Sequence, residues 1–195
     1  MSVNVNEKGL HIASNPELYE PAKSNAFDLL IPNLTNLLPQ GVQDEMATDE
    51  DYLSGAQEVI RLSVDSASVP HFTLGKVEVK RANSTIKFAS SPSWDSGTIK
   101  CTDFVGARTK DYLLALQAKA YDITTDKVRL ASNYKFDWTL IEYTGDYSRR
   151  IRQWTLKGAW ISGLSEEEFS HDGDGKRQIS VTVEYDRAIP EIINE

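Results

Sequence analysis

Two segments in the last third of the chain alternate between large apolar residues and polar or small ones. The first is Trp154–Trp160, with the sequence WTLKGAW, and the second is Ile179–Asp186, with the sequence ISVTVEYD. A period of two is typical of a β-strand with one buried face, because successive side chains point to opposite sides of the sheet. The charged stretch between the segments predicts a loop. The two segments are therefore expected to pair as a hairpin or as part of a β-meander.

Strand-like segments continue through most of the chain. A first strand is predicted over Asn25–Ile31, where Pro32 ends it, and a second over Glu58–Val64. The clearest hairpin has the arms Lys76–Lys80 and Thr85–Phe88 on either side of a short polar turn. Further strands are predicted over residues 97–102, 135–140, 152–160 and 177–185.

One helix is predicted over about residues 104–121. Its apolar residues recur at helical spacing and form a single stripe: Val105, Tyr112, Leu113, Leu116 and Ala120. Thr102 or Asp103 is the expected N-terminal cap. With about eight strands and one helix, the chain is predicted to be mainly β, as an antiparallel β-sandwich or partly closed barrel with one flanking α-helix.

The length of 195 residues fits one domain with additions. Residues 1–24 are polar, contain Pro16 and Pro21, and predict an extended N-terminal arm. Residues 25–195 are expected to form a single β-rich domain, in which residues 33–57 are an acidic loop insertion.

Charge and cysteine content exclude several functions. The chain has 21 basic and 29 acidic residues, a net charge of −8, which disfavours tight binding to nucleic acid phosphates or anionic membranes. Cys101 is the only cysteine, so neither an internal disulfide nor a cysteine-based metal site is expected, and a reducing compartment fits best. No run approaches about 18 apolar residues and Met1–Lys8 does not resemble a signal peptide, so no membrane anchor is predicted.

Catalytic signatures are also missing from the sequence. Neither a glycine-rich phosphate loop nor a nucleophile elbow is present. The three histidines have no metal-ligand spacing: His11, His71 and His171. Asp172–Gly175 resembles the start of a calcium loop, but basic residues follow directly, which favours an exposed turn. The chain is therefore predicted not to be an enzyme and to carry no cofactor or metal.

Two features point towards contacts between copies of the chain. The basic patch of Arg149, Arg150 and Arg152 is interpreted as a subunit contact, with phosphate binding as the alternative. The strand Ile179–Tyr185 is long and lacks proline, so it would leave an unpaired edge in a monomer. Closure of the sheet through a ring of subunits would pair that edge.

The order of these elements, from about Asn25 to Asp186, resembles the tail tube proteins of contractile-tailed bacteriophages, which are related to bacteriocin and type VI secretion tube proteins. Ser66–Pro70 is similar to the family's break of small residues and proline, and the hairpin and the single helix follow in the family's order. Trp154–Trp160 is similar to its penultimate strand and Val181–Asp186 to its last strand.

The resemblance implies a structural virion protein that forms hexameric rings. Such rings stack into the inner tail tube, inside a contractile sheath, and conduct double-stranded DNA during genome ejection. The implied partners are further copies of the chain and the sheath, baseplate and terminator proteins, with assembly in the host cytoplasm. Ile161 stands where the family often has proline, and the N-terminal arm and acidic insertion are long. A tube-initiator, terminator or baseplate ring protein is therefore the alternative.

Two sets of residues are expected to serve such a tube. The tip of the hairpin is expected to contact the next ring: Arg81, Ala82, Asn83, Ser84 and Thr85. Four acids on or beside strands are expected to face the lumen, where they would repel DNA phosphates: Asp65, Glu78, Glu142 and Glu184. The helix over 104–121 is expected on the outer side. A ligand-binding β-barrel with an open apolar interior, and an enzyme attached to a virion, are the alternatives from other classes.

Overall fold

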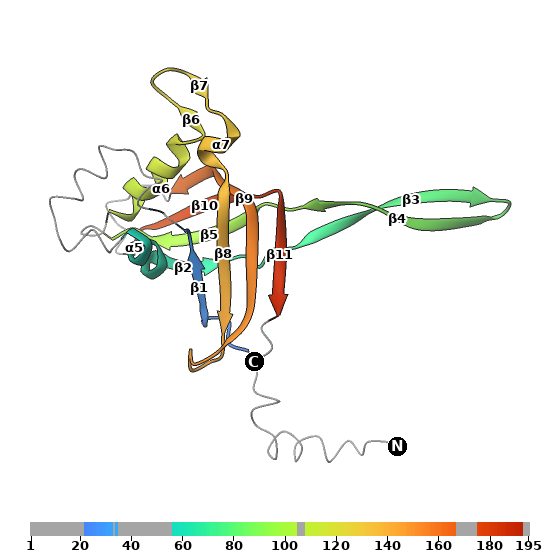
Figure 1. Ribbon diagram of the computed structural model, residues 1–195, viewed down its shortest axis with the longest axis horizontal. Coiled ribbons are helices and arrows are strands. Elements are labelled where there is room, and N and C mark those ends of the chain that lie inside the picture. Colours follow the sequence, from blue (N-terminus) through green and yellow to red (C-terminus); the bar gives the residue numbers. More distant parts are fainter. Residues whose placement is uncertain (1–21, 33, 35–55, 105–107, 167–174, 193–195) are drawn as a thin grey trace, which may run out of the picture.

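A computed structural model describes residues 22–32, 34, 56–104, 108–166 and 175–192. Within these ranges, two antiparallel layers of strands enclose a common core, and a long hairpin extends away from them (Figure 1). Most of the predicted N-terminal arm (1–24) and of the acidic insertion (33–57) lies outside the described residues, as does most of the Asp172–Gly175 turn. The prediction of a mainly β, antiparallel fold is confirmed.

The layers share one strand. The first layer contains β1 (Phe27–Leu30), β8 (Phe136–Tyr143), β9 (Arg150–Glu166) and β11 (Arg187–Ile192). The second layer contains the latter part of β9 with β10 (Gln178–Glu184), β5 (Gly97–Thr102) and β2 (Val64–Ala67). In Figure 1 the strands of one layer run across those of the other, as in an orthogonal sandwich.

Gly158 lies where β9 passes from one layer to the other. The strand pairs with β11 up to Lys157 and with β8 up to Ala159, and from Trp160 onwards it pairs with β10. Gly158 has a φ of 65°, in the left-handed region. A Cβ atom there would lie 2.5 Å from Oδ2 of Asp186. Glycine therefore permits both the backbone turn and the close approach of Asp186.

The core lies between the layers and confirms the alternation seen in the sequence. Ile179, Val181 and Val183 on β10 are buried, whereas the intervening Ser180 and Thr182 lie on the other face and are only partly buried. Trp138 from β8 is 1% exposed and packs in the same cluster. Burial of each such side chain contributes about 1.5–3 kcal/mol. The cavity in this part of the core measures only about 20 Å³, so the described side chains fill most of the space between the layers.

The predicted helix is confirmed as α6 (Thr109–Ala118), which is shorter than the expected 104–121. Tyr112, Leu113 and Leu116 are buried, as the apolar stripe predicted, whereas Val105 lies outside the described residues. The predicted cap is only partly right. The residue before the helix is Arg108, with a left-handed φ of 52°, while the Asp103 carboxylate accepts a 3.4 Å hydrogen bond from the Lys110 N–H.

The strand predicted over Glu58–Val64 is wrong, because α5 (Ala56–Ser63) occupies most of it. Ile60 and Ser63, three residues apart, are each 1% exposed, whereas Leu62 is 68% exposed. This is helical periodicity, which the β-branched pair at 59 and 60 concealed. The Gln57 side chain binds the backbone of β1, accepting from the Ile31 N–H and donating to the Leu29 carbonyl.

The unpaired edge predicted for Ile179–Tyr185 is also wrong. β10 lies between β9 and β5, so both of its edges are paired within one copy. The chain then continues into β11, which was not predicted and which pairs with β9 despite Pro190. Continuation of the sheet from β10 into a neighbouring copy is therefore excluded.

Gly158→Ala tests the passage of β9 between the layers. Alanine at a φ of 65° is strained, and we expect the free energy of unfolding in urea to fall by about 1–2 kcal/mol. Gly163→Ala in the same strand is the control, because its Cβ would only meet the Thr182 side chain at 3.7 Å. Equal losses in the two variants would contradict this role of Gly158.

Candidate assembly surfaces

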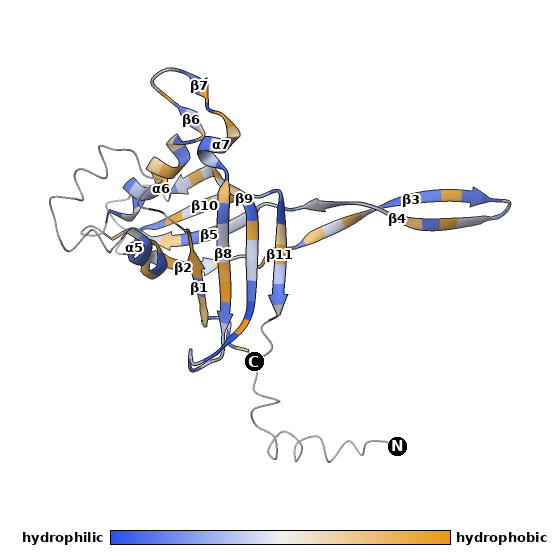
Figure 2. Cartoon of the chain, in the orientation of Figure 1, coloured by the Kyte–Doolittle hydropathy of each residue, from blue (hydrophilic) through white to orange (hydrophobic). Residues whose placement is uncertain are grey.

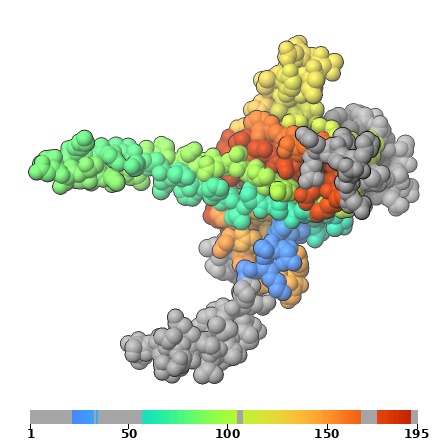
Figure 3. All heavy atoms as spheres, turned by 180° about the vertical axis from the view of Figure 1, so that it is seen from behind, coloured from blue at the N-terminus to red at the C-terminus, as the bar shows by residue number. Residues whose placement is uncertain are grey.

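The predicted hairpin is confirmed and is longer than expected, consisting of β3 (Phe72–Arg81) and β4 (Ser84–Trp94). It leaves the body as a two-stranded arm (Figures 1 and 3). At its base the Phe72 and Trp94 rings lie 4.8 Å apart, and Trp94 contacts Tyr185 of the core edge-on. The arm is thus fixed to the body at one end only.

The hairpin has one apolar and one polar face. Val77 pairs with Phe88, and Val79 pairs with Ile86, so these four side chains share a face. Their exposed fractions lie between 41% and 54%, and Figure 2 shows the alternating hydropathy along both strands. An isolated two-stranded hairpin is only marginally stable in water. A contiguous exposed apolar face often marks an interaction surface. The apolar face of the hairpin is therefore a candidate interaction surface.

The charge of the hairpin is opposite to that of the body. Its four basic residues and one acidic residue give it a net charge of +3, which leaves −11 for the rest of the chain. The opposite face carries most of these charges, including the Lys76–Glu78 ion pair at 3.0 Å. Such separation favours contact between the hairpin of one copy and the body of another.

The residues predicted to contact the next ring form the outer end of this arm. Arg81 pairs with Ser84 and Lys80 with Thr85, and Ala82 closes the turn with a left-handed φ of 51°. All five predicted tip residues are exposed. Their contact with another ring remains a prediction.

A second, smaller protrusion follows α6 and was missed at the sequence level. It contains β6 (Tyr121–Asp122), β7 (Lys127–Val128) and the short α7 (Ala131–Tyr134). We call residues 121–130 the ribbon. Its Asp122 carboxylate accepts from the N–H groups of Thr124 and Thr125 and pairs with Arg129 at 3.1 Å. The pattern of an aspartate with two threonines between aliphatic residues is a turn signal that could have revealed it.

An open groove lies at the opposite end of β8. Its volume is about 430 Å³, and its lining includes Phe27, Val69, Leu140, Tyr143, Ile151 and Arg152. Leu140 is 4% exposed and belongs to the core, whereas Val69 is 52% exposed. We call this feature the groove. Its apolar lining comes from β1, β8, β9 and the segment that follows β2.

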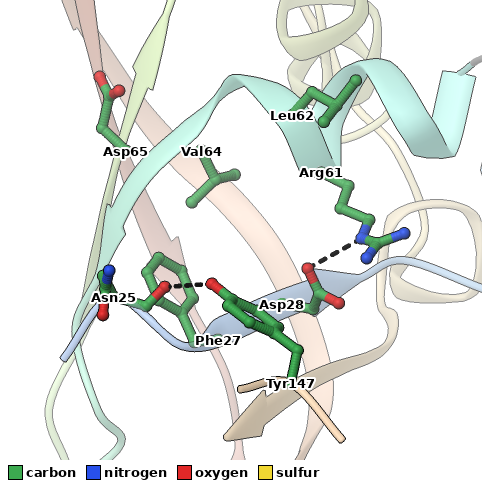
Figure 4. A pocket seen from close by; sticks show the side chains of 8 residues that line it. All are labelled: Asn25, Phe27, Asp28, Arg61, Leu62, Val64, Asp65 and Tyr147. Atoms are coloured by element: carbon green, nitrogen blue, oxygen red, sulfur yellow. Dashed lines mark hydrogen bonds and ion pairs between the residues drawn. The ribbon is translucent and has the colours of Figure 1, made fainter. Parts of the chain in front are cut away.

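A more polar pocket of about 320 Å³ adjoins β1, α5 and the turn between β8 and β9 (Figure 4). Arg61 donates to the Asp28 carboxylate at 2.8 Å, and the Tyr147 hydroxyl donates to the Asn25 carbonyl at 2.5 Å. The charged groups of Asp28 and Arg61 therefore satisfy each other, and the pocket offers no unpaired charge from this pair.

The basic patch lies at the turn between β8 and β9, next to the groove. Arg152 pairs with Glu142 at 3.4 Å, whereas the side chains of Arg149 and Arg150 have no acidic partner among the described residues. Asp146 orders the turn by accepting from Thr144 and Ser148, and these hydrogen bonds hold the pKa of its carboxyl well below the usual range. The two arginines are thus displayed on an ordered turn.

The four predicted lumen acids are not brought together. Asp65 lies on β2, Glu78 on the hairpin, Glu142 at the groove and Glu184 on β10. Glu142 also accepts from the Trp154 indole N–H, and Glu184 accepts from the Ser162 hydroxyl. The structure thus gives each acid a local partner, and their position in a lumen remains a prediction.

Among the described residues, no three or more His, Cys, Asp or Glu side chains are grouped closely enough to hold a metal ion. None of the helices in the described ranges is both long and apolar enough to cross a membrane. Burial raises the pKa of the Cys101 thiol to about 12, which keeps this buried side chain neutral and unreactive.

No protein-family model and no curated protein matches the sequence. Solved structures of contractile injection systems are nevertheless similar to the fold. A chain of the extended sheath–tube complex of PVC, an extracellular contractile injection system, matches with a TM-score of 0.61 at 13% identity, over 98% of this chain and 100% of that one.

Two terminating components are similar to the same degree. A chain of the anti-feeding prophage tube-terminating cap matches with a TM-score of 0.60 at 13% identity, over 89% of this chain and 92% of that one. A chain of the PVC sheath/tube terminator matches with a TM-score of 0.59 at 13% identity, over 89% of this chain and 99% of that one. The chain therefore has the tube-like fold of contractile injection systems, which confirms the fold that the resemblance to tail tube proteins predicted.

Asp65→Asn tests whether this acid has a structural role. Partial burial acts to raise its pKa, but hydrogen bonds from Thr102, Lys176 and Gln178 outweigh it and hold the pKa below the ordinary 3.8. The ionised carboxylate therefore stabilises the fold above about pH 4, and this contribution is lost as the pH falls through the folded-state pKa.

We expect Asp65→Asn to lower the free energy of unfolding by about 1 kcal/mol at pH 7, with the deficit shrinking below pH 4. Urea unfolding at several pH values measures both. Glu78→Gln is the control, because its ion pair with Lys76 is exposed and contributes little. A deficit for Asp65→Asn that is independent of pH would contradict the assignment.

Proposed function

We propose that the chain is a structural subunit whose copies form hexameric rings, and that these rings stack into the inner tube of a contractile tail. The observation that carries the proposal is the β3–β4 hairpin, a long arm whose apolar face no described part of the chain covers. The likeness of the fold to components of contractile injection systems supports it. Because the hairpin and the body differ in charge and shape, their contact is heterologous and generates rings or filaments.

In this proposal the tip of the hairpin contacts the next ring, and the tube conducts double-stranded DNA during ejection from a virion. The net charge of −8 supports the passage of DNA without adhesion to the wall of the tube, because acidic side chains repel phosphates. The β-rich domain of 25–195 forms the ring, with the arm of 1–24 and the insertion of 33–57 as additions. Sheath, baseplate and terminator proteins are the proposed partners, and assembly takes place in the host cytoplasm.

A terminator, initiator or baseplate ring is the second candidate. It is favoured by the similarity of the fold to a tube-terminating cap and to a sheath/tube terminator, with TM-scores close to that of the sheath–tube complex. Such a subunit would form a ring without extending it. A ligand-binding barrel is disfavoured because the cavity between the layers is only about 20 Å³.

Negative-stain electron microscopy of the purified protein, with mass measurement of the same sample, tests both candidates. Hollow tubes of uniform width would support the tube subunit, whereas single rings at all concentrations would support the terminating or initiating role. A stable monomer at tens of micromolar would overturn both.

Phe88→Asp tests the apolar face of the hairpin. A charge on this face would have to be desolvated in the contact. We therefore expect the association constant of the subunits, measured by sedimentation velocity, to fall on the order of tenfold or more. Ala89→Asp is the matched control, because this neighbouring residue is also exposed but lies on the polar face opposite Lys76. Equal effects of the two substitutions would show that added charge, rather than the apolar face, is responsible.

Deletion of Arg81–Ser84 tests the tip. The tip makes no contact with the core, so the shortened subunit should retain the circular dichroism and unfolding transition of the native chain. We expect rings that no longer stack. Tubes of normal length from the deletion variant would exclude the tip as the contact between rings.

A further inference from the structure

The structure carries a second assembly surface that the hairpin does not explain. We infer that the ribbon of one copy docks in the groove of a second copy, and that this contact joins neighbours within one ring. The inference rests on the proposed function, because it specifies how a ring of such subunits closes.

The ribbon has the features of a preformed docking element. Ile123, Val128 and Leu130 are 84%, 77% and 76% exposed, the highest values among the large hydrophobic residues that the structure describes. The hydrogen bonds around Asp122 and the bond from the Arg129 N–H to the Ala120 carbonyl hold the ribbon in one shape. Because the ribbon is already ordered, docking it costs little conformational entropy. Figure 3 shows it, in yellow, as a protrusion separate from the hairpin.

The groove offers the complementary recess. Leu140 forms part of its apolar floor, and Phe27 and Val69 are among its lining residues. Its volume of about 430 Å³ is large enough for more than one aliphatic side chain. Among the three cavities described above, it is the open one whose lining is mainly apolar, since the pocket of Figure 4 is polar and the cavity in the core is too small.

The positions of the ribbon and groove require two copies. The ribbon precedes Phe136, the first residue of β8, whereas the groove includes Tyr143, its last residue. The two surfaces therefore lie at opposite ends of the same strand (Figure 1) and cannot meet within one copy. Repeated head-to-tail docking closes into a ring when the rotation between neighbours allows it. In Figure 1 the hairpin runs across the direction of β8. A contact through the hairpin would therefore add copies in a different direction from the ribbon–groove contact.

Unpaired charges on the two surfaces are complementary. Asp126, at the turn of the ribbon, accepts a hydrogen bond from the Tyr121 hydroxyl but has no cationic partner among the described residues. Arg149 and Arg150 stand directly before Ile151 and Arg152 of the groove, and they have no acidic partner within the same part of the chain. Head-to-tail docking brings the acid of one copy towards the arginines of the next, which favours this orientation over others.

A charge exchange in the full-length chain tests the contact. We expect Asp126→Arg and Arg150→Glu each to raise the protein concentration needed for ring formation on the order of tenfold, and the double variant to restore it. We also expect Ile123→Asp to abolish rings, whereas Leu114→Asp should not, because Leu114 is exposed on α6 outside both surfaces. Sedimentation velocity and electron microscopy provide the measurements, and circular dichroism checks that each variant is folded.

Mixing two defective variants gives an independent measurement. Ile123→Asp leaves the groove intact and Val69→Asp leaves the ribbon intact, so a mixture should form one ribbon–groove contact that neither variant forms alone. An excess of two-subunit complexes in the mixture is the expected result. If the mixture contains no more two-subunit complex than the separate variants do, the inference is overturned.

The outcomes separate this inference from the proposed function. Rings that persist in Ile123→Asp, or a charge exchange that restores nothing, would overturn the ribbon–groove contact while leaving the tube subunit intact. Failure of the native chain to form rings or tubes at any concentration would overturn the proposed function, and the ribbon–groove contact with it.

Discussion

The pairing of β9 in both layers is the interaction on which the rest of the structure depends. Its first part lies between β8 and β11, and its second part pairs with β10, which in turn pairs with β5. β9 passes from one layer to the other at Gly158, whose backbone is left-handed. The direction of the strand at this point relates the orientation of one layer to that of the other. The positions of the hairpin, the ribbon and the groove follow from it, because each is attached to a strand or connection of one of these layers.

The exposed apolar residues show how stability and association are separated in this chain. The buried residues of the two layers form one core cluster, and the cavity between the layers measures only about 20 Å³, so the described part of the body is well packed on its own. The hairpin and the ribbon contribute little to that core. They place aliphatic side chains away from the body, where burial is available only through association. In the proposed assembly, the residues that stabilise the fold and those that stabilise contacts between copies are therefore different.

Much of the fold could be predicted because it is encoded in local periodicity. The alternation at Trp154–Trp160 and Ile179–Tyr185, the β3–β4 hairpin and the buried stripe of α6 all follow from spacing within one segment. Pairing partners are not local, so the sequence did not show that β10 would have a strand on each side. The same limit applies to the candidate sites. The hairpin tip and the basic patch could be found, but the groove is assembled from distant segments, and the ribbon is too short for a periodic pattern.

The bonds from Gln57 to β1 and the proline in β11 have a consequence for the kinetics of assembly. Gln57 occupies backbone groups of Leu29 and Ile31 on one outermost strand, and Pro190 removes a backbone donor from another. A protein that accumulates to high concentration before it polymerises is at risk of joining through its sheet edges, which accept almost any extended chain. With these edges blunted, growth depends on side-chain surfaces that recognise only the correct neighbour. In the proposed assembly, rings and tubes can then grow at high subunit concentration without competing pairing between sheet edges.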